Sequence, residues 1–227
     1  MHEIGVREVM QVESLGLNFN IETLEMTWLV MAIVILIAWL ATRNLKMVPT
    51  GWQNVLEIAI TGLHGQMDGM MGKKNRQLLA PFIVSLFLFL LVSNLIGLVP
   101  TLASPTNDLN TTLGLALLVI VMVHVLGLQR RGLEYIGHFF KPTPVFVVIN
   151  VIEEIAKPIT LAFRLFGNIL AGEILIIILL EIAKWWIIPS VCWLAFSIFI
   201  GCIQAFVFTM LSTAYFSISM KTPEEEE

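Results

Sequence analysis

The chain has 227 residues, of which 57% are hydrophobic and 13% are charged, and its formal net charge is −4. Soluble domains carry about 25% charged residues, so this composition excludes an ordinary soluble domain, and it gives no support to a nucleic-acid-binding role. Runs of roughly 18 or more apolar residues recur along the chain, and each is long enough for a helix to cross the ~30 Å hydrocarbon core of a bilayer. We therefore predict an all-α, polytopic membrane protein that forms one membrane domain over residues 1–227.

The N-terminal segment, residues 1–26, is acidic and only weakly apolar. It lacks the basic start and the apolar core of a signal peptide, so we expect it to remain in the mature chain as an external segment. The first membrane helix is predicted at 27–42, with Trp28 and Trp39 near its ends as interface anchors. Residues 51–70 alternate apolar and polar side chains, which predicts an amphipathic helix lying on the membrane surface.

Four further membrane helices are predicted after this segment. They lie at 80–99, 112–128, 144–183 and 187–218, and a tail follows at 219–227. The stretch of some 40 residues at 144–183 would reach ~60 Å as a helix, about twice the hydrocarbon thickness. It must break, with Pro158 as a candidate, or lie strongly tilted. We predict that it forms a long, strongly tilted hairpin with the last helix, a shape that would suit a curved partner.

The basic residues predict the orientation of the chain. With these spans, nine of them fall on one side of the membrane and two on the other. The positive-inside rule then places the N-terminus outside and the C-terminal tail in the cytoplasm. The nine are Arg43, Lys46, Lys73, Lys74, Arg76, Arg130, Arg131, Lys141 and Lys221, and the two are Arg7 and Lys184.

Neither the cysteines nor the histidines form a pattern with known chemistry. Cys192 and Cys202 fit no metal-ligand spacing and are typical of small packed residues. The histidines are scattered, and of the four only His124 falls within a predicted span; the others are His2, His64 and His138. Because the chain also has no phosphate loop and no hydrolase motif, we expect no cofactor and no metal.

Arg164 is the most unusual residue, because it lies inside an apolar segment. A charge at the centre of a bilayer costs roughly 2.5–3.5 kcal/mol on insertion scales. At ~100° per residue, four polar residues fall within about 40° of Arg164 on one helix face, and Glu173 falls on the opposite face. The four are Glu153, Lys157, Thr160 and Asn168. A purely structural ion pair remains an alternative for Arg164, and Glu153 and Lys157 are spaced to compensate each other.

The last helix carries its polar residues on one face. Ser197, Gln204 and Tyr215 are separated by 7 and 11 residues, which brings them to the same side. Polar residues in membrane helices usually bond to a neighbouring helix. Since the last two helices are predicted to run antiparallel, we expect Gln204 to pair with Arg164.

Several segments resemble one family. The stretch "KPITLAFRLFGNILAGE" (157–173) strongly resembles the signature of subunit a of F-type ATP synthases, the stationary channel subunit that faces the rotating ring of c subunits. The segments at 104–117, 130–144, 150–158 and 203–217 are similar to corresponding family segments in the same order. The resemblance covers roughly residues 27–220 and is closest to the bacterial and chloroplast form.

The resemblance implies roles for individual residues. Arg164 matches the family's indispensable arginine, Glu173 the acid of the outer half-channel and Gln204 the glutamine that pairs with the arginine helix. Asn168 matches the asparagine one turn after the arginine. At the position where some members have a histidine, this chain has Ser197, which does not titrate near neutral pH. Further channel-lining candidates are Asn94, Asp108 and Tyr215, with Glu153 and Glu154 on the cytoplasmic side.

The function that the resemblance implies is proton translocation coupled to ring rotation and ATP synthesis, by a subunit that is not itself catalytic. The implied partners are the c-ring, the subunit b stator, the F1 sector through the complex, and membrane lipid. The implied location is a bacterial cell membrane, with the thylakoid membrane as the alternative. Two other classes stay open from the residues: a secondary transporter whose intramembrane arginine binds substrate, and a structural subunit of a respiratory complex.

Overall fold

A computed structural model describes residues 9–12, 17–99, 102, 104–132, 135, 146–182 and 187–220 of the chain. The helices are α1 (Ile21–Thr42), α2 (Trp52–Ile96), α3 (Leu109–Arg131), α5 (Phe146–Ile182) and α6 (Ile187–Met220), with a 3-10 helix η1 (Pro105–Asn107) before α3. Within the described residues, four helical stretches are long and apolar enough to cross a membrane: α1, α2, α3 and Trp193–Met220 of α6. The prediction of an all-α polytopic membrane protein is confirmed.

The N-terminal segment differs from the prediction in two ways. Strands β1 (Val9–Val12) and β2 (Leu17–Asn20) form a small antiparallel hairpin, which adds a two-stranded element to the helical fold. Helix α1 then begins at Ile21, six residues before the predicted start. Glu22 lies in the first turn of α1, where a negative charge interacts favourably with the helix dipole. Glu22 and Glu25, which the prediction placed in the N-terminal segment, therefore belong to α1.

Helix α2 joins the segment predicted at 51–70 to the one predicted at 80–99, with a change of direction between them. Gly72 has φ 74° and ψ 162°, a conformation that only glycine adopts readily. Two contacts hold this bend: Arg76 Nη1 lies 2.8 Å from Asp68 Oδ2, and the Asn75 side chain donates to the carbonyl of Met71 at 3.1 Å. The first part of α2 exposes Trp52 and buries Met67, and an amphipathic helix on the membrane surface stays a prediction for it.

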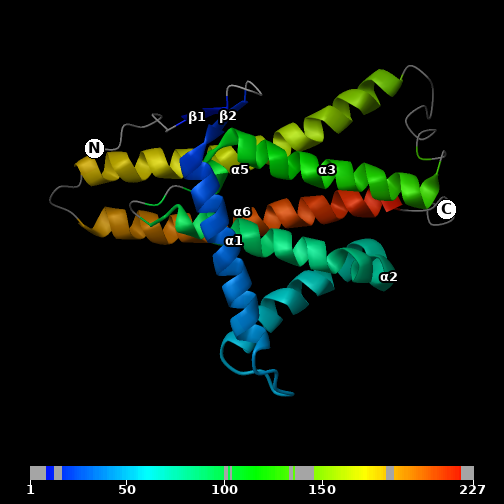
Figure 1. Ribbon diagram of the computed structural model, residues 1–227, viewed down its shortest axis with the longest axis horizontal. Helices are drawn as coiled ribbons and strands as arrows, with labels where there is room; N and C mark the ends of the chain where they lie inside the picture. Colours follow the sequence, from blue (N-terminus) through cyan, green and yellow to red (C-terminus); the bar gives the residue numbers. More distant parts are fainter. Residues whose placement is uncertain are drawn as a thin grey trace.

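The second part of α2 packs with α3, α5 and α6 as a bundle (Figure 1). Aliphatic residues of all four helices meet in one core, and Phe82 of α2 packs edge-on against Phe216 of α6, with ring centroids 6.0 Å apart. In Figure 1, α1 crosses this bundle steeply, and the bend of α2 lies near the same end of the bundle as the end of α6. The long helices therefore run at a large angle to α1.

Helix α5 is continuous over 37 residues, although Pro158 lies inside it. Of the two alternatives for this segment, a break at the proline is therefore wrong. At ~1.5 Å per residue α5 is about 55 Å long, which exceeds the hydrocarbon thickness and leaves the tilt as the prediction. Helices α5 and α6 run side by side in opposite directions and contact each other (Figure 1).

Candidate functional site

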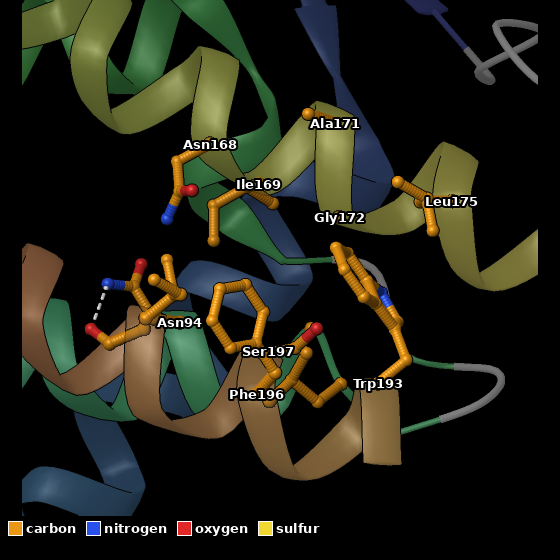
Figure 2. Close-up of a pocket in the computed structure, with 13 residues that line it drawn as sticks. Asn94, Asn168, Ile169, Ala171, Gly172, Leu175, Trp193, Phe196 and Ser197 are labelled. Carbon is orange, nitrogen blue, oxygen red and sulfur yellow. Dashed lines mark hydrogen bonds between the residues drawn. The ribbon is translucent and has the colours of Figure 1, made fainter. Parts of the chain in front are cut away.

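A cavity of about 110 Å³ lies between α5 and α6, and we name it the Asn168 cavity. Most of its wall is apolar, but Asn94 of α2, Asn168 of α5, and Trp193 and Ser197 of α6 contribute polar groups. In Figure 2, Asn168 projects from α5 toward α6, and the Trp193 indole lies between the two helices. The apolar run of α5 thus places an amide four residues after Arg164, in contact with an open space.

Two buried polar atoms in the wall of the Asn168 cavity find no partner among the described residues. They are the Trp193 Nε1 and the Ser197 Oγ, which make no hydrogen bond in this part of the chain. Buried polar groups are nearly always satisfied by protein or by ordered water, and a cavity of this size has room for several water molecules. These two groups are therefore suited to hold water in the cavity.

Asn94 lines the same cavity, but both ends of its amide are occupied. Its Nδ2 donates to the carbonyl of Gly201 in α6 at 3.0 Å, and its Oδ1 accepts from the Thr106 hydroxyl at 3.2 Å. Ser104 joins the same network, because its hydroxyl donates to the carbonyl of Ser93 at 2.8 Å and lies 2.7 Å from the Thr106 hydroxyl. The network fastens the turn before α3 to both α2 and α6.

Asp108, a predicted channel-lining residue, is placed away from both cavities. Its carboxylate accepts from Asn20 Nδ2 at 2.7 Å and from the Thr23 hydroxyl at 3.2 Å, which ties the start of α1 to the start of α3. It also caps α3 by accepting from the backbone N–H of Asn110 at 2.9 Å. These contacts give Asp108 a structural role in this arrangement.

A second cavity, of about 180 Å³, lies near the start of α5, and we name it the Lys157 cavity. The charged residues that line the two cavities all belong to this one. Lys157 is paired with Glu154 and lies 3.8 Å from Glu153, and its ammonium lies 5.6 Å from the centre of the Tyr215 ring. The predicted cytoplasmic pair Glu153 and Glu154 and the predicted Tyr215 therefore meet here. The polar residues of the wall are Arg131, Tyr135, Asn150, Glu153, Glu154, Lys157, Tyr215 and Ser219.

Sequence reasoning missed His124 and Tyr135 at this site. His124 Nδ1 lies 2.7 Å from the Tyr135 hydroxyl, and His124 Nε2 lies 3.6 Å from Glu154 Oε2. Burial raises the pKa of the Tyr135 phenol, and the neighbouring Glu154 carboxylate adds to that shift. The one available signal was that His124 is the histidine inside a predicted span.

Arg164 lies on α5 between the two cavities and lines neither. It is exposed, and among the described residues no hydrogen bond or ion pair joins it. The exposed side chains near it on α5 are mixed: Phe163 is 54% exposed, and the polar Glu153 and Thr160 are exposed on the face of Arg164. Gly167 and Ala171 are exposed on the same side, so the helix presents small residues next to the guanidinium.

The remaining predicted residues of the proton path are Gln204 and Glu173. Gln204 is buried, but its Nε2 has no hydrogen-bond partner, and in the described part of the chain no bond joins it to Arg164, so the predicted pairing is not formed here. Glu173 lies on α5 between Gly172 and Leu175, which both line the Asn168 cavity, and its side chain lies outside the described residues.

The fold and these cavities define a class: a multi-pass membrane protein with a charged residue on an exposed helix face and, on either side of it along the helix, a cavity with polar groups in its wall. The chain matches the family described as "ATP synthase A chain" over residues 24–217. It is also 48% identical over 211 residues to the ATP synthase subunit a of Desulforamulus reducens, covering 89% of this chain and 80% of the relative. The chain belongs to the ATP synthase subunit a family. This assignment replaces the secondary transporter and the respiratory-complex subunit as alternatives.

Proposed function

We propose that this protein is the stationary proton-translocating subunit of its ATP synthase, with two offset half-channels separated by Arg164. The position of Arg164 between the two cavities carries this proposal. Arg164 follows Lys157, the last α5 residue in the wall of the Lys157 cavity, by seven residues and precedes Asn168 by four. At ~1.5 Å per residue these separations are about 10 Å and about 6 Å along the helix.

The role of Arg164 is electrostatic. A guanidinium stays protonated at cellular pH, so it does not relay protons. A cation close to a carboxylate lowers the pKa of that carboxylate by about 1–3 units. A protonated carboxyl that a c subunit brings toward Arg164 would therefore release its proton, and the same positive charge would repel protons and prevent a leak between the half-channels.

The exposed face of α5 supports a helical partner at this position. Gly167 and Ala171 leave room beside Arg164, because a Cβ added at Gly167 would meet no atom within 4 Å. Small residues allow membrane helices to approach closely. The c-ring is the partner that we propose for this face. Subunit b and the F1 sector would contact the protein elsewhere in the complex, and catalysis of ATP synthesis would take place outside this chain.

The Asn168 cavity is the proposed outer half-channel, with Glu173 and Asn168 on α5 and water held by Ser197. The Lys157 cavity is the proposed cytoplasmic half-channel, with Glu153 and Glu154. This assignment follows the predicted orientation, with the N-terminus outside a bacterial membrane. Each elementary charge that crosses gains about 2.3 kcal/mol per 100 mV, and the offset between the half-channels would convert that energy into rotation.

The test is ATP-driven proton pumping by the whole complex in inverted vesicles. Arg164→Ala should abolish pumping while the c-ring still co-purifies with the complex. Arg43→Ala is the matched control, because Arg43 is exposed beyond the end of α1, where it stacks on Trp39 with its guanidinium 5.1 Å from the ring centre. Normal pumping by an assembled Arg164→Ala complex would show that Arg164 is only a structural charge and would refute the proposal.

A further inference from the structure

The geometry around His124 points to a second group that handles protons. Both ring nitrogens face a titratable side chain: Nδ1 lies 2.7 Å from the Tyr135 hydroxyl and Nε2 lies 3.6 Å from Glu154 Oε2. Tyr135 and Glu154 line the Lys157 cavity, whereas His124, on α3, contacts both of them and is not itself one of the lining residues. The imidazole therefore bridges two residues of the cavity wall that come from different segments.

The side chains around His124 suit a group that binds and releases a single proton. Lys157 is paired with Glu154, so the carboxylate has an amine group beside it. A neutral imidazole can accept a proton at one ring nitrogen while the other nitrogen keeps its hydrogen bond, so the ring can bind and release one proton between two partners. The charged and titratable groups around His124 are Glu153, Glu154 and Lys157 on α5, Arg131 on α3, Tyr215 on α6, and Tyr135.

Tyr135 is held in a position that fixes the ring of His124. A Cβ at Gly127 would collide with the side chains of Tyr135 and Ser219, so the absence of a side chain at Gly127 allows both to approach α3. Ser219 is anchored in turn, because its hydroxyl donates to the carbonyl of Val123 at 2.8 Å. Burial raises the pKa of Tyr135, so the phenol keeps its proton at neutral pH and remains a hydrogen-bonding partner of the imidazole.

We propose that His124 and Glu154 act as one proton-binding pair that serves the Lys157 cavity at neutral pH. This inference rests on the proposed function of that cavity as the cytoplasmic half-channel. In the uptake step, a proton from water in the cavity reaches Glu154 and is taken up at Nε2 of the neutral imidazole. The resulting imidazolium faces the Glu154 carboxylate, and loss of one proton to cavity water restores the starting state. Tyr135 is a positioning residue for the ring.

The test measures passive proton flux through the assembled membrane sector in vesicles, as a function of the pH on the cytoplasmic side. His124→Gln keeps hydrogen-bonding capacity toward both neighbours but does not titrate. We expect its flux to fall by about tenfold or more, since a positioned proton-transfer group contributes factors of 10² or above. The inflection of the flux near neutral pH should disappear, and added imidazole should restore part of the flux. His64→Gln, a histidine on the first part of α2, is the control and should behave as wild type.

The outcomes separate this inference from the function on which it rests. If Arg164→Ala abolishes ATP-driven pumping and His124→Gln conducts protons with the wild-type pH profile, the His124–Glu154 pair is refuted and the proposed function stands. If Arg164→Ala pumps protons normally, the proposed function itself is refuted. If His124→Gln does not assemble, Tyr135→Phe takes its place: the inference requires a shifted midpoint of the pH profile, and an unchanged midpoint overturns it.

Discussion

Replacing Asn94 with leucine should destabilise the fold by a small, calculable amount. Asn94 is 1% exposed and makes two hydrogen bonds, to the Gly201 carbonyl and from the Thr106 hydroxyl. Neither partner would be left unsatisfied: the Gly201 carbonyl lies inside α6, where the helix supplies its own bond, and Thr106 keeps its contact with Ser104. The loss is therefore the two bonds themselves, each worth about 1 kcal/mol, and leucine fills the space that alanine would leave empty.

The expected loss of about 1–2 kcal/mol corresponds to a factor of roughly 5–30 in the folding equilibrium. Detergent-driven unfolding in mixed micelles, followed by the fluorescence of the six tryptophans, would measure it. Asn110→Leu is the control, because Asn110 is exposed. Combining Asn94→Leu with Thr106→Val should cost less than the sum of the two single changes, since they share one bond. Identical unfolding curves for wild type and Asn94→Leu would refute the idea that this network holds α6 against α2.

Three further predictions concern single positions. Arg164→Lys should lose ATP-driven proton pumping in an assembled complex, because a lysine can shed its proton in an apolar site whereas a guanidinium does not; pumping at the wild-type rate would contradict this. Asp108→Ala should lower the free energy of unfolding by about 1–3 kcal/mol, because it removes the cap of α3 and the contact with the start of α1. Limited proteolysis should then cut the N-terminal segment faster than in wild type, whereas Asn110→Ala should behave as wild type. Gly127→Val should displace the side chains packed against that glycine and remove the neutral-pH inflection of proton flux, whereas Gly114→Ala, which has open space around it, should keep it.

The helical architecture could be predicted because long apolar runs determine it locally. The predicted spans 112–128 and 187–218 begin and end within three residues of the ends of α3 and α6. The start of α1 was placed too late, because Glu22 and Glu25 were assigned to an external segment although helix starts favour acidic residues. The bend at Gly72 was not foreseen, since the sequence 69–77 contains two glycines and does not show which of them adopts a positive φ.

The candidate site was predictable only where its residues share one helix. Arg164 and Asn168 follow from spacing along α5, and so does the i, i+4 contact between Glu153 and Lys157. The partners of Asn94 and Asp108 lie 107 and 88 residues away in sequence, so no local pattern indicated that both side chains are already occupied. Chain packing, rather than residue type, decides which polar groups face a cavity and which hold helices together.

The exposed position of Arg164 itself argues for a partner that carries a carboxyl. In the apolar core of a membrane the guanidinium would cost roughly 2.5–3.5 kcal/mol or more, and no described residue of this chain forms an ion pair with it. A permanent carboxylate from the same chain would compensate it but would also occupy the face on which it acts. In the proposed function, a carboxyl of the ring reaches Arg164, loses its proton there and then moves away. The guanidinium is then compensated by each carboxylate in turn, and the face of α5 stays free for the next one. On the proposed function, the lack of a fixed counter-ion for Arg164 among the described residues is a condition for rotation.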